Sequence, residues 1–422
     1  MLPINHYAKS SAMNQKMRLL SHSITQISRF IFLLLCFFSL SLLTSCIEDD
    51  EPVVASGNKF LVASGGSATV KAGLYEYDVT KNSFDHISDY YPHYLSLEYL
   101  DYNNNRVAFT TDIKPAESSC IAYADINNWA GLKFVPIPAT GDPESYFAVP
   151  TAIRPRVLKD GKIVYNVVWN TSNPWDDYHI GQLAIYDPAT NNIELSGDPS
   201  GFVLAQPEKG ADTEGGSMSG AFDVSPDGKY VYCQVYGYGT SWGQYHIDYK
   251  FIVSYEVGKP GSYKRIAQSY ETISGVTGNG KYLVLSGDGL RKIDLSSNAL
   301  EKFDDYPNTF SPNQVSKNSS KMIKMWRGSG CGLFDLDDAA PWQFTIIDGS
   351  KLSGSYRGLG HGLQFSPDES KIIFTASSDF NTNYASPLRV FSCPVAENIT
   401  KPDSIGTMPV EYCTGVFLLL NK

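Results

Sequence analysis

The 422-residue sequence has few charges, few basic residues and a single long apolar run. Charged residues make up 18% of the chain, and 34 Lys and Arg stand against 44 Asp and Glu, for a formal net charge of −10. Nucleic-acid binding is disfavoured, because phosphate contacts need clustered basic side chains. No P-loop, HExxH, nucleophile-elbow or paired-carboxylate signature stands out, so the sequence gives little support for catalysis.

The seven cysteines are widely spaced, and the absence of a Cys-x-x-Cys pair argues against a zinc knuckle. In an exported protein disulfides can form, and Cys393 with Cys413 is then the first candidate pair. The alternative, supported at least equally well, is that all cysteines after Cys46 are buried thiols that pack as small apolar groups.

Three histidines, His179, His246 and His361, could approach one face, and three imidazoles can hold a metal. His361 stands between two glycines, however, where a structural role at the start of a strand is equally natural. We therefore predict no metal and no other cofactor.

The one long apolar run extends from Ile31 to Leu43 and follows the basic residues Lys16, Arg18 and Arg29. A basic segment before a short apolar segment is typical of a secretory signal, and the run is too short to span a bilayer comfortably. We predict a signal peptide over residues 1–45.

The residues that close this run, Leu43-Thr44-Ser45-Cys46, resemble the lipobox of bacterial lipoproteins. The resemblance implies that Cys46 becomes the first mature residue and carries acyl chains, which anchor stably when two or more are present. Residues 46–57 then form a solvated tether, because Glu48 to Glu51 are four consecutive carboxylates. This acidic run also resembles the signal that sends lipoproteins of Bacteroidota to the outer face of the outer membrane. A periplasm-facing position is the alternative.

The rest of the chain, residues 58–422, has the composition of a turn-rich β protein, since the sequence contains 27 Tyr, 35 Gly and 23 Pro. One pattern recurs along it. A short apolar strand leads into a tight turn, a second apolar strand and a loop follow, and a third strand ends in an acidic residue before a weaker fourth strand. The clearest turns are Ser225-Pro226-Asp227-Gly228, Thr277-Gly278-Asn279-Gly280 and Ser366-Pro367-Asp368-Glu369. Proline fixes φ there, and Asp, Asn and Gly supply the side-chain bond and the positive φ.

Four-stranded units that recur every ~40 to 60 residues indicate a β-propeller. The units resemble those of TolB-like and WD40-like propellers, and this resemblance implies an all-β fold of about seven four-stranded blades, with six or eight as alternatives. Such turns are specific for the fold and say little about function. The first unit begins at Lys59 and lacks a convincing first strand. We expect the apolar segment Gly415 to Leu420 to pair near Phe60 to Ala63 and to close the ring, which hides two strand edges.

The loops between the second and third strands are predicted to carry the binding surface, because they vary in length and are rich in Trp, Tyr, Asn and Asp. Sugar rings stack on aromatic faces while amides and carboxylates bind hydroxyls, and the same composition suits a protein partner. The alternative is that these aromatic side chains pack the loops against one another. The candidate binding residues in these loops are Trp169, Trp175, Tyr178, Tyr238, Trp242, Tyr245, Trp326 and Arg327. The short turns between first and second strands, and Gly215-Gly216-Ser217, are interpreted as structural turns.

Arg154 and Arg156 complete the candidate set. They stand two residues apart at the start of a strand, so their side chains are expected to point the same way. They could meet an anionic ligand in the channel, or they could pair with Glu98 and Asp223.

These features predict a non-enzymatic surface lipoprotein that binds a ligand or partner for an outer-membrane uptake complex. The candidate ligand is a glycan, and the candidate partner is a TonB-dependent receptor. One alternative is a propeller enzyme, a lyase or hydrolase acting on glycans, and another is a structural scaffold of the envelope. No catalytic residue is assigned, and binding is favoured over catalysis.

Overall fold

The computed structural model divides the chain into two units, Met1–Ser56 and Gly57–Lys422, and describes parts of the second. The predicted signal peptide, Cys46 and the acidic tether lie outside the described residues. The described residues are 59–64, 71–90, 100–103, 105–112, 119–136, 138, 151–170, 179–207, 212–241, 244–287, 289–304, 313–326, 330–337, 345–348, 358–359, 363–366, 368–377, 389–395, 403–407 and 413–419. Among them, no helix has the length and apolar character needed to cross a membrane.

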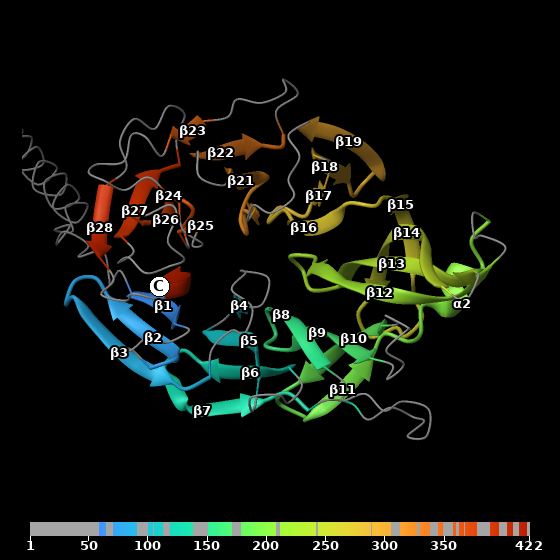
Figure 1. Cartoon of the computed structure of the whole chain (residues 1–422), viewed down its shortest axis with the longest axis horizontal. Helices are drawn as coiled ribbons and strands as arrows, with labels where there is room; N and C mark the ends of the chain where they lie inside the picture. The colour runs from blue at the N-terminus through green and yellow to red at the C-terminus, as the bar shows by residue number, and fades with distance from the viewer. Residues whose placement is uncertain are drawn as a thin grey trace, which may run out of the picture. The chain divides into compact units, whose positions relative to one another are not determined.

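These residues form an all-β, propeller-like fold of seven antiparallel sheets, as the repeat pattern predicted (Figure 1). Sheet I contains β1 (Lys59–Ser64), β2 (Gly73–Asp78), β3 (Ser83–Ser88) and β29 (Cys413–Leu419). Sheet II contains β4 (Leu100–Asn103), β5 (Arg106–Asp112), β6 (Ser119–Asp125) and β7 (Asn128–Phe134). Sheet III contains β8 (Thr151–Val157), β9 (Ile163–Asn170), β10 (His179–Asp187) and β11 (Asn192–Leu195).

The other four sheets follow in chain order. Sheet IV contains β12 (Thr213–Val224), β13 (Tyr230–Ser241), β14 (Gln244–Glu256) and β15 (Lys264–Gln268). Sheet V contains β16 (Thr272–Val276), β17 (Tyr282–Gly287), β18 (Gly289–Asp294) and β19 (Ala299–Asp304). Sheet VI contains β20 (Asn313–Val315), β21 (Lys321–Trp326), β22 (Gly330–Asp335) and β23 (Thr345–Asp348). Sheet VII contains β24 (Gly358–Leu359), β25 (Gln364–Phe365), β26 (Lys371–Ser377), β27 (Arg389–Pro394) and β28 (Asp403–Thr407). A short helix, α2 (Ser200–Leu204), precedes β12.

The apolar core lies between the sheets, because both faces of most strands are covered. In β1, Phe60 and Val62 pack into a cluster with sheet VII, whereas Leu61 and Ala63 pack into a cluster with sheet II. This division follows from the two-residue period of a strand, which sends alternate side chains to opposite faces. All four residues are completely buried, so β1 is apolar throughout, as strands buried on both faces are.

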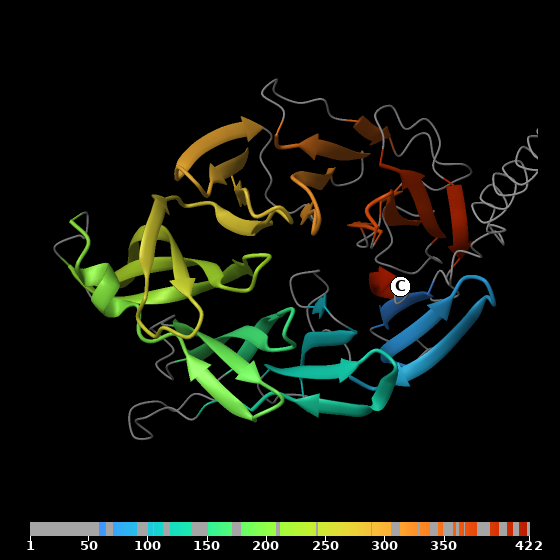
Figure 2. The same ribbon diagram turned by 180° about the vertical axis from the view of Figure 1, so that it is seen from behind.

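Seven such clusters connect the sheets. Six of them join consecutive sheets, from I with II to VI with VII, and the seventh joins sheet VII to sheet I. In Figures 1 and 2 each sheet of residues 57–422 accordingly lies beside the next one along the chain.

The predicted pairing of the C-terminal segment with the first unit is present in the structure. Strand β29 pairs antiparallel with β1, and the register places Val62 opposite Val416 and Ala63 opposite Gly415. The first sheet therefore takes one strand from the far end of the chain, in the order β29-β1-β2-β3.

The tight turns adopt the conformation expected from their residues. In the turn after β12, Ser225 Oγ donates to Asp227 Oδ1 at 2.6 Å, and Lys229 N donates to the same oxygen at 3.1 Å. Gly228 has a φ of 74°. In the turn before β26, Glu369 takes the place of this glycine and has a φ of 55°. Hydrogen bonds of short polar side chains thus stabilise the turns that precede these second strands.

The disulfide between Cys393 and Cys413 is not formed. Cys393 is a buried thiol, and its Sγ donates to the carbonyl oxygen of Ile372 at 3.8 Å. Cys120 and Cys233 are likewise buried thiols, which agrees with the alternative of packed thiols for these three residues.

Candidate functional site

The structure places three of the predicted loop residues at strand ends and leaves four outside the described part of the chain. Trp169 lies near the end of β9, Trp326 ends β21, and Tyr245 lies near the start of β14. They were predicted to lie in the loops between a second and a third strand, but all three lie within the strands that border these connections. The residues outside the described ranges are Trp175, Tyr178, Trp242 and Arg327.

Sheet IV provides a long support for one of these loops. Its strands β12, β13 and β14 have 12, 12 and 13 residues, whereas β9 has 8 and β21 has 6. Strands β13 and β14 stay paired from Tyr230 opposite Glu256 to Ser241 opposite Gln244, with one register shift. The described ladder of this hairpin therefore extends as far as Ser241 and Gln244.

Helix α2 braces this hairpin through close backbone contact. A Cβ atom on Gly216 would lie 2.5 Å from Val203 Cγ2, and one on Gly237 would lie 3.0 Å from Val203 Cγ1. Ser200 Oγ also accepts a hydrogen bond from Gly216 N at 3.1 Å. The turn predicted at residues 215–217 is therefore wrong: these residues lie inside β12, and glycine is present because the helix packs directly on the strand.

Tyr238 is the one predicted aromatic residue whose side chain the structure describes. It is half-buried, and its hydroxyl would lie 2.4 Å from a Cβ on Gly215, its neighbour across the sheet. The ring thus packs over Gly215, which is the packing role left open as the alternative.

The two-residue spacing of Arg154 and Arg156 does not by itself determine the directions of their side chains. A register shift falls between Ile153 and Arg156, and Arg154 has a φ of 56°, so the strand is not regular between them. Arg154 N donates to Thr110 Oγ1 at 3.0 Å. Arg156 Nε donates to Asp223 Oδ1 at 3.0 Å, which is one of the two alternatives that the sequence left open. Glu98 lies outside the described residues.

Asp223 gathers contacts from several sheets. Its Oδ2 accepts from Val276 N in sheet V at 2.7 Å. Burial alone would raise the pKa of this carboxyl, but the charges of Lys317 and Arg156 and two backbone N–H groups together hold its pKa below the ordinary value. Lys317, from sheet VI, also lies 3.8 Å from Asp101 of sheet II. Charged side chains of sheets II, III, IV and VI are thus coupled, and a backbone N–H of sheet V joins them.

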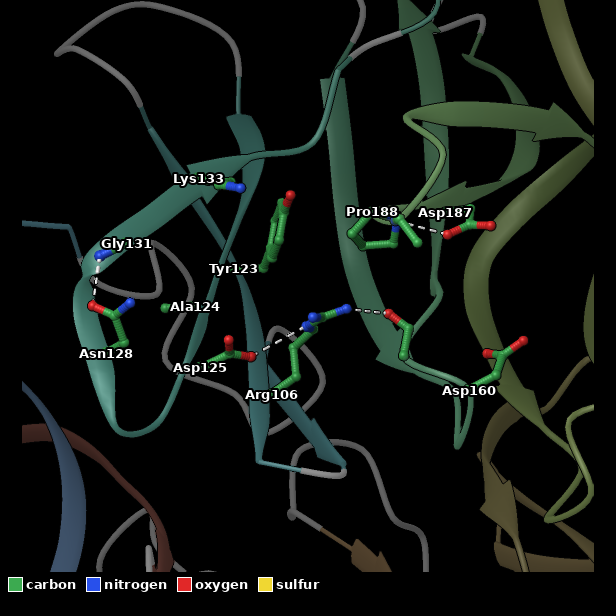
Figure 3. Close-up of a pocket in the computed structure, with 12 residues that line it drawn as sticks. Arg106, Tyr123, Ala124, Asp125, Asn128, Gly131, Lys133, Asp160, Asp187 and Pro188 are labelled. Carbon is green, nitrogen blue, oxygen red and sulfur yellow. Dashed lines mark hydrogen bonds and ion pairs between the residues drawn. The ribbon is translucent and has the colours of Figure 1, made fainter.

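A polar hollow of about 330 Å³ opens between sheets II and III (Figure 3). Sheet II contributes the start of β5, the end of β6 and strand β7, and sheet III contributes the turn between β8 and β9 and the turn between β10 and β11. The lining residues are Arg106, Tyr123, Ala124, Asp125, Asn128, Gly131, Lys133, Asp160, Gly161, Asp187, Pro188 and Ala189. None of these residues was predicted from the sequence, because the short turns were assigned a structural role and no motif marks the lining.

Arg106 lies at the base of this hollow in Figure 3 and bridges the two sheets. Its Nη1 donates to the carbonyl oxygen of Gly161 at 2.7 Å, and its guanidinium carbon lies 5.7 Å from the centre of the Tyr123 ring. Burial, and then the hydrogen bond with Tyr186, raise the pKa of Tyr123. The phenol therefore stays protonated at neutral pH.

The opposite wall carries carboxylates that are already bonded. Asp187 Oδ1 accepts from Ala189 N at 2.9 Å, and this bond is the largest cause of the lowered pKa of Asp187. Asp160 Oδ2 lies 2.7 Å from Lys162 Nζ. With its pKa lowered, the Asp187 carboxylate is ionised at neutral pH.

Within the described residues, no group of three His, Cys, Asp or Glu side chains is placed to hold a metal ion. His361 lies outside these residues, and His179 and His246 contribute backbone to β10 and β14.

A scan of protein-family models finds no match, and no curated protein matches the chain in sequence. Among solved structures, a candidate 6-phosphogluconolactonase of Bacteroides fragilis is similar with a TM-score of 0.46 and 12% identity, over 87% of this chain and 98% of that chain. An acylaminoacyl peptidase of Pyrococcus horikoshii gives a TM-score of 0.45 and 10% identity, over 79% of this chain and 47% of the peptidase. A puromycin-hydrolyzing peptidase of Mycobacterium tuberculosis gives a TM-score of 0.39 and 9% identity, over 75% of this chain and 54% of the peptidase. The chain thus spans about half the length of these two peptidases.

Proposed function

We propose that residues 58–422 form a closed β-propeller in which each of the seven sheets is one blade. Two observations support the proposal: the apolar clusters link the sheets in a cyclic order, and β29 pairs with β1. A strand taken from the far end of the chain joins the two termini of a ring, and a closed ring leaves only short, protected edges.

On this scaffold we place a non-enzymatic binding function for an outer-membrane uptake complex. The protein is anchored at the cell surface through acylated Cys46, and it binds a glycan or a partner protein such as a TonB-dependent receptor. The observation that carries the proposal is the braced hairpin of sheet IV. A loop held on a rigid support loses little conformational entropy when it binds, so its aromatic side chains can contribute strongly to affinity.

The binding surface is tested with two substitutions, Trp175→Ala and Trp242→Ala. Each is expected to weaken binding by ~1–3 kcal/mol, as aromatic hot-spot residues do, while the melting temperature stays close to that of the wild type. The probes are a glycan array and a detergent-solubilised outer membrane that contains the receptors. Tyr270→Ala, which removes an aromatic side chain that is 62% exposed in the connection between β15 and β16, is the control. Unfolding of both tryptophan variants would show that the loops pack on the domain instead.

The anchor is tested separately with Cys46→Ala. The variant is expected to leave the membrane fraction or to remain unprocessed, because it has no thiol to acylate. Detergent-phase partitioning equal to that of the wild type would contradict the proposed anchor and would leave the binding surface unaffected.

A further inference from the structure

The hollow between sheets II and III contains two hydrogen-bond donors whose bonding is incomplete. Arg106 Nε is buried and has no hydrogen-bond acceptor among the described residues. Asp125 Oδ1 lies 3.6 Å from it, which suits an ion pair but is too long for a hydrogen bond. Lys133 is exposed on the wall beside Tyr123, and no described residue forms an ion pair with it.

The three carboxylates of the hollow have partners of their own. Asp160 is paired with Lys162 and Asp187 with the N–H of Ala189, while Asp125 faces Arg106. With Lys162 included, three positive and three negative side chains balance around the hollow. Lys133 is therefore the exposed donor of the hollow that lacks an acceptor, and the guanidinium of Arg106 adds a second positive charge. The chemical group that suits an ammonium and a guanidinium together is a carboxylate.

The same carboxylates restrict what else the ligand can carry. A second acidic group would meet Asp160 and Asp187 and be repelled, whereas hydroxyl groups could donate to them. In Figure 3 Tyr123 and Lys133 lie on one side and Pro188 and Asp187 on the other, with Arg106 below. A volume of about 330 Å³ is at the lower end for small-molecule sites, and so suits a single small ligand.

We propose that this hollow is a binding site for a small hydroxylated monocarboxylate, such as a sugar acid. Arg106 and Lys133 receive the carboxylate, and the aspartates of sheet III accept hydroxyl groups. The site contains none of the loop residues assigned to the proposed binding surface. Experiments can therefore refute one of the two binding sites and leave the other unaffected.

The test is calorimetric titration of the intact protein with D-glucuronate, with D-glucose as the neutral counterpart and D-glucarate as the dicarboxylate. Glucuronate is expected to bind saturably, and glucose and glucarate to bind at least about tenfold more weakly. Equal binding of glucose, or no saturable binding of glucuronate, would overturn the proposal.

Three variants test the location. Lys133→Gln is expected to weaken glucuronate binding about tenfold through the loss of one charge-assisted contact. Ala189→Trp fills the hollow from an exposed turn position and is expected to abolish binding. Lys229→Gln removes an exposed lysine from a turn of sheet IV, outside the hollow, and should bind like the wild type. Because all three positions are exposed, thermal melting should match the wild type. Wild-type affinity in Lys133→Gln or Ala189→Trp would refute the site.

Discussion

Arg156 Nε and Asp223 Oδ1 lie 3.0 Å apart and join β8 of sheet III to β12 of sheet IV. The second oxygen of Asp223 accepts the N–H of Val276, so one carboxylate connects three consecutive sheets. Both side chains are largely buried, with exposed fractions of 15% for Arg156 and 11% for Asp223. A buried arrangement of this kind is costly to break from one side, because the remaining charge keeps its burial and loses its partner.

Asp223→Ala is therefore expected to lower the free energy of unfolding by ~3–5 kcal/mol in urea denaturation. Asp125→Ala is the matched control: it removes a carboxylate that is 60% exposed and 3.6 Å from Arg106, and exposed pairs contribute ~1 kcal/mol or less. Equal losses in the two variants would mean that Asp223 has no special role in joining the sheets.

The turn before β26 predicts a local pH dependence. Ser366 Oγ donates to Asp368 Oδ1 at 2.5 Å, and this bond is the first cause that lowers the pKa of Asp368 to about 2. Because the folded pKa lies below the unfolded value of ~3.9, the carboxylate stabilises the fold above the unfolded pKa, and this stabilisation is lost as the pH falls through about 2.

Titration of the Asp368 carboxyl carbon by NMR should give a midpoint near 2 in the wild type. Ser366→Ala should move that midpoint upward, while Ser262→Ala, in a different sheet, should leave it unchanged. A midpoint that does not move in Ser366→Ala would show that the serine hydroxyl is not the cause.

The contact between Gly216 and Val203 predicts a compensating pair of substitutions. Gly216→Ala places a methyl group against Val203 and is expected to destabilise the protein by ~1–3 kcal/mol, as overpacking does. Adding Val203→Ala removes the closest atom, Cγ2 at 2.5 Å, but keeps Cβ at 2.9 Å, and should recover part of this loss. Gly201→Ala, where nothing lies within 4 Å of the new Cβ, is the control within α2. Additive losses in the double variant, measured by thermal unfolding, would contradict the direct contact.

Removal of β29 tests the pairing of the chain ends. Deletion of residues 413–422 exposes the edge of β1 and is expected to give insoluble protein or a much lower melting temperature. Deletion of residues 420–422 alone retains every residue of β29 and serves as the control. A soluble truncation that lacks β29 and melts cooperatively at the wild-type temperature would show that the sheet does not depend on this strand.

Local sequence was sufficient to predict the repeated strands and most of their tight turns, although not the strand that contains residues 215–217. It also predicted that the C-terminal strand would pair with the first unit. The apolar run of β1, whose side chains point alternately to two faces, and the Ser-Pro-Asp-Gly turn at residues 225–228 are short-range features. They are governed by the two-residue period of a strand and by φ preferences. The pairing of residues 413–419 with β1 was also predictable. The first unit lacks a strand, and an apolar segment at the end of the chain can supply it and become buried.

The tertiary structure alone decided where charges and small residues meet. The position of Arg156 depends on a register shift in β8 that the residue spacing does not reveal. Position 216 is a glycine because helix α2 packs directly on it, and not because the chain turns there. The hollow around Arg106 is made by turns of two different sheets, each ordinary in sequence. Periodicity acts between neighbours along the chain, and so it specifies the elements. Contacts between elements depend on how whole sheets pack, and no short pattern of residues encodes that.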